Sequence, residues 1–143
     1  MNELNKAIVF AAQLHEGQTD KGGNEYIQHP LRVMDNVETR REKIVAVLHD
    51  VVEDTDATVE NIEEQFGRSV AKDVAVLTKE DGQEYMEYID QICSYPVPRR
   101  VKRADLHDNM DLSRLREITQ KDLERRNRYE RAFDQIEAAC VVL

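Results

Sequence analysis

The chain has 143 residues, of which 41% are hydrophobic and 34% are charged, and its formal net charge is −9. This size and hydrophobic content predict one domain over residues 1–143, and the negative charge argues against a nucleic-acid-binding protein. The sequence shows neither an apolar run of about 18 residues nor the pattern of a signal peptide, and Cys93 and Cys140 lack metal-site spacing, so we expect a cytoplasmic protein with reduced thiols and no membrane span.

The first half of the chain alternates helical patterns with one loop. Apolar residues at helical spacing predict an amphipathic helix over 3–16. The glycine-containing stretch 17–28 is predicted to be a loop, and Pro30 suits the first turn of a second helix that ends near Val37. The segment 42–52 is apolar on all sides, and its charged flanks favour a buried central helix over a buried strand.

The second half contains only helical patterns, with prolines and glycines between them. No hairpin signal is present, so we predict an all-α fold, a single bundle of short helices around the buried helix 42–52. The further helices are predicted over 58–66, 68–78, 83–95, 98–114 and 120–142.

The adjacent residues His49 and Asp50 lie in the most apolar segment of the chain. A buried aspartate costs several kcal/mol unless its charge is matched, and a divalent cation is the simplest match. The alternative is a hydrogen-bonded core histidine beside an exposed aspartate at a helix end. On a continuing helix Glu53 shares a face with His49, and Asp54 shares one with Asp50, so four ionisable groups would require a positive partner.

Two other segments offer metal-ligand side chains. His29 follows the glycine-containing loop at the start of the second helix. Asp105 lies in an apolar stretch, and the spacing of Lys102, Asp105 and Asn109 predicts one shared helical face. The neighbouring Asp108 is expected to point away from this face, as a surface or structural residue.

Together these motifs resemble the HD phosphohydrolase superfamily, in which a histidine precedes a His-Asp pair and a later aspartate. The likeness is closest to hydrolase domains of the RelA/SpoT type. Residues 15–30 resemble their opening motif, residues 48–55 their second motif, and residues 102–110 their third. Short stand-alone proteins of this family are small alarmone hydrolases.

The resemblance implies a reaction and a set of residue roles. The family removes pyrophosphate from the 3′ position of guanosine tetra- or pentaphosphate, which gives GDP or GTP. The implied cofactor is one Mn²⁺ ion, the implied partner is a small nucleotide substrate, and the oligomeric state stays open. The implied metal ligands are His29, His49, Asp50 and Asp105; the acid/base pair is Glu53 and Asp54; and the substrate-binding residues are Lys21, Tyr26, Lys102 and Asn109.

Three departures from the family pattern concern substrate binding. Asp20 stands where the family has an arginine that packs on the purine base, and aspartate cannot stack and repels a polyanion. Glu25 replaces a proline, and Asp111 and Leu112 replace arginine and threonine. These departures leave open an adenine nucleotide, another phosphorylated nucleotide, or a non-catalytic nucleotide-binding module of the same fold.

A phosphorylated substrate also requires local positive charge, because the average field of the chain repels it. Lys21 and Lys102 are the predicted phosphate-binding lysines. Arg99, Arg100 and Arg103 either assist them or are solvated. We interpret the remaining cluster as an ordinary charged helix face; it comprises Arg125, Arg126, Arg128 and Arg131.

Overall fold

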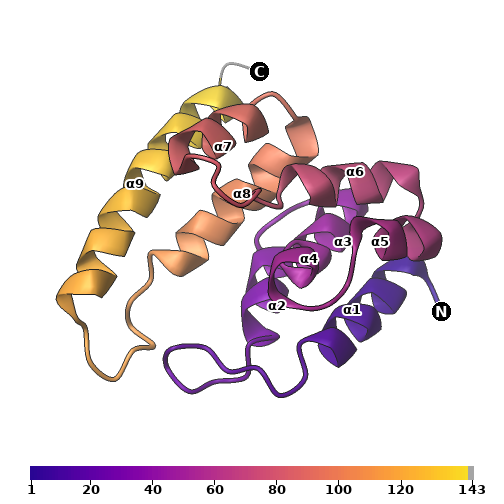
Figure 1. The fold of residues 1–143 in the computed structure, drawn as a ribbon, viewed down its shortest axis with the longest axis horizontal. Helices are drawn as coiled ribbons and strands as arrows, with labels where there is room; N and C mark the ends of the chain where they lie inside the picture. Colours follow the sequence, from indigo (N-terminus) through magenta and orange to yellow (C-terminus); the bar gives the residue numbers. More distant parts are fainter. Residues whose placement is uncertain (142–143) are drawn as a thin grey trace.

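Figure 1 shows the computed structural model, which describes residues 1–141. Within these residues the only β-type pairing is an isolated bridge between Thr19 and Glu25, so the all-α prediction is confirmed. In chain order the helices are α1 (Glu3–Leu14), α2 (Gln28–Asp35), α3 (Arg40–Leu48), α4 (Val51–Asp54), α5 (Val59–Phe66), α6 (Arg68–Val76), α7 (Tyr85–Ile92), α8 (Pro96–Asn109) and α9 (Gln120–Val141).

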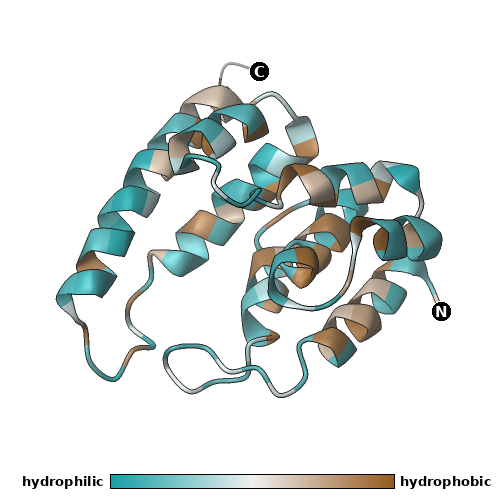
Figure 2. Cartoon of the chain, in the orientation of Figure 1, coloured by the Kyte–Doolittle hydropathy of each residue, from teal (hydrophilic) through white to brown (hydrophobic). Residues whose placement is uncertain are grey.

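Helix α3 lies at the buried centre. The Thr39 side chain accepts the backbone N–H of Glu42, and the Glu42 carboxylate accepts the backbone N–H of Thr39. This reciprocal cap satisfies donors that a helix start otherwise leaves open. All side chains from Ile44 to Leu48 are buried, and α3 packs against α1, α2, α6 and α8. In Figure 2 the hydrophobic colour concentrates on α3 and its neighbours, while α9 is mostly hydrophilic.

The predicted continuous helix over 42–52 is wrong at its end, because α3 stops at Leu48 and α4 begins at Val51. The carbonyl of Ala46 accepts the backbone N–H of His49 at 3.4 Å and also the His49 ring Nδ1 at 2.5 Å. This carbonyl would otherwise accept the backbone N–H of Asp50 in a regular α-helix. The break therefore follows from a histidine side chain that occupies a helical acceptor.

Several helix boundaries in the second half of the chain differ from the prediction, among them both ends of α7 and of α8. Helix α8 begins at Pro96, before the predicted start at residue 98. A proline fits this first position because the N–H that it lacks would have no partner within the helix. Helix α8 ends at Asn109 and not near residue 114. The predicted last helix agrees with α9, except that residue 142 lies outside the described residues.

Two long connections meet at the lower edge of Figure 1. One joins α1 to α2 over residues 15–27, and the other joins α8 to α9 over residues 110–119. They touch where Gly22 approaches Arg114 so closely that a Cβ on Gly22 would lie 2.6 Å from the Arg114 carbonyl oxygen. Among the described residues, no helix has both the length and the apolar character needed to cross a bilayer.

Candidate metal centre and adjoining pocket

The four predicted metal ligands come together from three places in the fold. His29 lies in the first turn of α2, His49 and Asp50 lie at the break between α3 and α4, and Asp105 lies on α8. One potential ligand atom from each residue lies within 4.8 Å of the other three. Residues separated by up to 76 positions in the chain therefore form one compact cluster.

The spacing of these atoms suits a single divalent ion. Asp105 Oδ1 is 2.9 Å from His29 Nε2 and 3.2 Å from His49 Nε2, while Asp50 Oδ2 is 3.2 Å from His49 Nε2 and 3.6 Å from His29 Nε2. Ligand atoms about 2.0–2.2 Å from one ion lie roughly 3–4 Å apart. Two imidazoles with two carboxylates match divalent transition-metal ions, so the donor set fits the group that the resemblance implies.

Each histidine is oriented by a second hydrogen bond. His49 donates through Nδ1 to the carbonyl of Ala46, and His29 donates through Nδ1 to Asp108 Oδ2 at 2.6 Å. Both rings therefore turn Nε2 toward the cluster. Burial disfavours the charged ring of His29, yet the hydrogen bonds to Asp105 and Asp108 outweigh it and raise its pKa to about 9. Without a metal, protons on the imidazoles balance the carboxylates.

The carboxylates of the cluster are fixed by neighbouring donors. Lys102 Nζ lies 2.9 Å from Asp105 Oδ2, and Asn109 Nδ2 donates to Asp105 Oδ1 at 3.1 Å, so the three residues share the predicted face. The Tyr26 hydroxyl donates to Asp50 Oδ2 at 2.5 Å. Burial opposes ionisation of Asp50, but the adjacent His49 lowers its pKa to about 2.

Glu53 and Asp54 lie on α4, at the edge of the cluster, and both are exposed. Glu53 accepts the backbone N–H of Lys79 with one oxygen, and Asp54 Oδ2 lies 3.2 Å from the Tyr26 hydroxyl. Partial desolvation raises the pKa of both carboxyl groups, and the charge of Asp50 raises them further. The pair therefore borders the candidate metal site and remains open to water.

Asp108 is placed differently from the prediction. It does not point away from the Asp105 face, because its buried carboxylate contacts His29 and also accepts Arg32 Nε at 2.8 Å. Arg114 adds a contact of 3.3 Å to Asp108 Oδ1. The three-residue spacing between Asp105 and Asp108 could have revealed this role, because residues three apart on a helix are neighbours.

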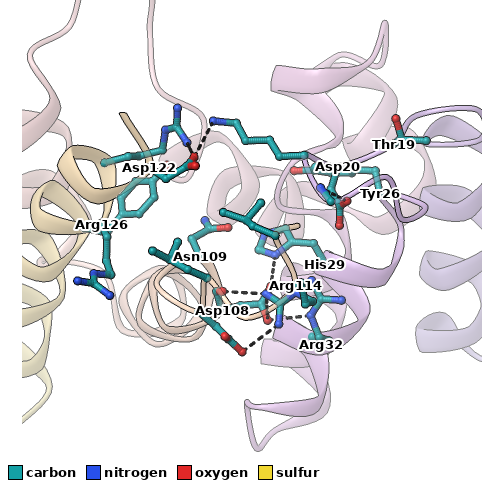
Figure 3. A pocket seen from close by; sticks show the side chains of 17 residues that line it. Thr19, Asp20, Tyr26, His29, Arg32, Asp108, Asn109, Arg114, Asp122 and Arg126 are labelled. Carbon is teal, nitrogen blue, oxygen red and sulfur yellow. Dashed lines mark hydrogen bonds and ion pairs between the residues drawn. The ribbon is translucent and has the colours of Figure 1, made fainter. Parts of the chain in front are cut away.

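A cavity of about 330 Å³ adjoins the cluster between α2, α8, α9 and the two long connections. Tyr26, His29 and Asn109 line its end near the cluster, and Figure 3 shows Asp122 and Arg126 on the α9 side. The cationic residues that line it are Lys21, Arg32, Arg114, Arg125 and Arg126. Four aspartates line the same cavity and pair with most of these cations; they are Asp20, Asp108, Asp111 and Asp122. Five cationic and four anionic side chains leave this wall slightly positive, so an anionic ligand meets less repulsion here than over the acidic average of the chain.

The source of this positive charge differs from the prediction. Arg99 is buried and donates to the Cys93 carbonyl, Arg100 pairs with Glu42, and Arg103 pairs with Glu137. None of these three residues lines the cavity within residues 1–141.

Instead, Arg125 and Arg126, which we interpreted as part of an ordinary charged face, line the cavity from α9. The way α8 and α9 pack against each other determines which arginines reach the pocket. The spacing of residues along one helix cannot predict this packing.

Two predicted substrate-binding residues are engaged in ion pairs. Lys102 is almost buried against Asp105. Lys21 lines the cavity, and its Nζ lies 3.9 Å from Asp122 Oδ1. The departure at Asp20 also has a structural use, because its carboxylate accepts the backbone N–H groups of Gly22 and Asn24, each at 2.9 Å. Asp20 therefore fixes the loop that forms one wall of the cavity.

Comparison with known proteins decides the family. The family model of the HD domain matches residues 7–97, which is more than half of the chain. The chain belongs to the HD-domain family. A solved structure described as a metazoan ortholog of SpoT that hydrolyzes ppGpp is similar at a TM-score of 0.81 and 25% sequence identity, over 95% of this chain and 85% of that one.

Curated proteins are also similar in sequence to this chain. A guanosine-3′,5′-bis(diphosphate) 3′-pyrophosphohydrolase of Aquifex aeolicus is 37% identical over 120 residues, which is 76% of this chain and 17% of that protein. The bifunctional (p)ppGpp synthase/hydrolase SpoT of Escherichia coli is 40% identical over 85 residues, which is 57% of this chain and 12% of that protein. The chain thus spans less than a fifth of either relative.

Proposed function

We propose that this HD-domain chain is a metal-dependent hydrolase that removes pyrophosphate from the 3′ position of (p)ppGpp-like nucleotides. The products are GDP or GTP, or the adenosine equivalents, and pyrophosphate. The observation that carries the proposal is the cluster of His29, His49, Asp50 and Asp105 beside a cavity that His29 also lines and to which five cationic side chains contribute. The relatives named for this reaction support it, as does the similarity to the metazoan ppGpp hydrolase.

The cluster would hold one divalent ion, which we propose to be Mn²⁺ in a cytoplasmic protein. His29 and His49 would bind it through Nε2, and Asp50 and Asp105 through carboxylate oxygens, because these are the atoms that converge. Such an ion lowers the pKa of bound water and neutralises charge that grows on an attacked phosphoryl group. The hydrogen bonds from Tyr26, Lys102 and Asn109 hold the two carboxylates in place beforehand.

Glu53 and Asp54 are the proposed proton-transfer pair. Hydrolysis requires the attacking water to lose a proton, and the departing 3′ oxygen to gain one. The Lys79 backbone N–H fixes one oxygen of Glu53, so the other oxygen can accept the proton of a water molecule at the edge of the cluster. The raised pKa of each carboxyl group brings it closer to the working pH, as proton exchange in catalysis requires.

The cavity defines how a nucleotide would lie. Its pyrophosphate would face the cluster, where Asn109 and Tyr26 line the wall, and its base and remaining phosphates would extend toward α9. Tyr129 offers an aromatic face there, and Lys21, Arg125 and Arg126 offer positive charge. A charged hydrogen bond to a phosphate contributes about 1.5–3 kcal/mol, so this end of the cavity can discriminate between nucleotides.

Product analysis tests the proposal. The full chain is incubated with each of a set of candidate substrates, once in the presence of Mn²⁺ and once in the presence of a chelator. The substrates are guanosine and adenosine 3′-pyrophosphates, nucleoside triphosphates and NADPH. Chelator-sensitive release of pyrophosphate from a 3′-pyrophosphate is expected. The matched control is Glu53→Gln, which keeps the shape of the side chain and removes its proton acceptor. Turnover that is equal in this variant would refute the assignment of Glu53.

A second candidate activity is hydrolysis of another phosphorylated nucleotide, and Asp20 favours it. Its carboxylate lies in the wall of the cavity, where the family places a stacking arginine. Release of orthophosphate from NADPH or from ordinary nucleotides, without cleavage of any 3′-pyrophosphate, would select this activity. The absence of all turnover would instead leave a non-catalytic nucleotide-binding domain.

A further inference from the structure

We infer that Asp108 is a positioning residue that orients the proposed metal ligand His29 and, with the same carboxylate, holds two arginines of the pocket wall. The inference rests on the proposed function, because it takes His29 as a metal ligand. It gives a role to a residue that lies within the third motif but was not among the predicted site residues. Its basis is a set of contacts made by one buried side chain.

The first contact sets the ring of His29. Asp108 Oδ2 lies 2.6 Å from His29 Nδ1, and the carboxylate is 9% exposed. An imidazole that donates Nδ1–H to a carboxylate presents Nε2 as its lone-pair atom, and the carboxylate increases the basicity of the ring. His29 Nε2 is the atom that faces Asp105 and Asp50. Asp108 thus selects the ring orientation and tautomer that metal binding needs.

The second set of contacts fixes Asp108 itself. Arg32 donates from Nε to Oδ1 at 2.8 Å and from Nη2 to Oδ2 at 3.1 Å, a bidentate pairing that allows one orientation of the carboxylate. Arg114 Nη2 lies 3.3 Å from Oδ1 and donates to the Asp108 backbone carbonyl at 3.0 Å. Figure 3 shows this group beside the cavity.

The arrangement links two parts of the site. Arg32 comes from α2, one turn after His29, and Arg114 comes from the α8–α9 connection. Both guanidinium groups line the cavity, and both are about 30% exposed. Asp108 therefore joins the cluster to the pocket wall. Its loss should weaken metal binding more than it weakens substrate binding.

Mn²⁺ binding to the full chain, measured by calorimetric titration without substrate, tests this role independently of any activity. Asp108→Ala is expected to weaken Mn²⁺ binding by about 10–100-fold, as loss of an outer-shell carboxylate does, and Asp108→Asn by less. The matched control is Asp111→Asn, because Asp111 contacts the same Arg114 and does not touch His29. Asp105→Ala, which lacks a proposed ligand, should abolish tight binding.

Thermal unfolding in chelator separates positioning from a purely structural role. Asp108→Ala also removes a partner of two arginines, so the melting temperature of this variant should fall. The Mn²⁺ titrations are therefore made at a temperature where circular dichroism shows the variant to be folded. A lower melting temperature with unchanged Mn²⁺ affinity would overturn the inference. If Asp108→Ala does not fold, Arg32→Gln is measured in its place. It is expected to weaken Mn²⁺ binding by a smaller but measurable factor, and an unchanged Mn²⁺ affinity would again overturn the inference. Tight Mn²⁺ binding in Asp105→Ala would instead refute the proposed metal site.

Discussion

Replacing Lys102 by methionine should destabilise the metal-free protein strongly. The ammonium group lies 2.9 Å from Asp105 Oδ2, with side-chain exposures of 12% for Lys102 and 4% for Asp105. At that separation and an effective dielectric constant of about 20, the attraction is about 6 kcal/mol, before the cost of desolvating both charges. Removing one partner of a buried pair typically costs about 3–5 kcal/mol, and we expect a loss in that range.

The measurement is urea unfolding followed by helical circular dichroism, at pH 7 with chelator. Arg103→Met is the matched control on the same helix, because Arg103 pairs with Glu137 and their side chains are 47% and 37% exposed. Such an exposed pair contributes at most about 1 kcal/mol. Equal losses in the two variants would refute the reasoning. An unchanged stability of Lys102→Met with a raised KM would show that Lys102 binds substrate instead.

Three further predictions concern protons and substrate. Because Asp105 and Asp108 raise the pKa of His29 to about 9 against the effect of burial, its contribution to metal-free stability is complete below about pH 6.5 and is lost as the pH rises toward 9. The free energy of unfolding should fall by about 3 kcal/mol over that window, and in His29→Gln it should depend less on pH. An equal dependence of the unfolding free energy on pH in both proteins would contradict this prediction. Glu53→Gln should lower kcat by about 10²–10⁴-fold with Mn²⁺ affinity unchanged, and a parallel loss of affinity would make Glu53 a ligand. Arg126→Ala should raise the nucleotide KM by about tenfold, whereas Arg131→Ala, which lies outside the cavity lining, should not; equal KM values in both would exclude Arg126 from the binding site.

The sequence reveals the cluster more completely than its surroundings. An aspartate inside an apolar segment requires a charge partner, so His49 and Asp50, together with the nearby carboxylates, predict a candidate site, and the structure brings these two residues together with His29 and Asp105. The end of α3 escapes this reasoning, because the His49 ring competes with the backbone for the Ala46 carbonyl. Helix propensity does not report such a side-chain contact.

The pocket cations illustrate the other limit. Spacing along α8 places Lys102 beside Asp105 correctly, because both residues belong to one helix. Which arginines face the cavity depends on how α8 and α9 pack together, and Arg125 and Arg126 reach it from residues that we interpreted as an ordinary charged face of the last helix. Contacts within a helix follow from periodicity, whereas contacts between helices require the packed fold.

The close approach of Gly22 to the Arg114 carbonyl limits which residues of the pocket wall can be substituted. The width of the pocket at that point is determined by one backbone resting on another, since even a methyl group at residue 22 would collide with the carbonyl oxygen. Other side chains that line the pocket, such as Lys21 and Arg126, can be substituted without changing this contact between the two backbones. Substitutions that aim to change ligand preference are therefore best placed at the lining side chains and not at Gly22.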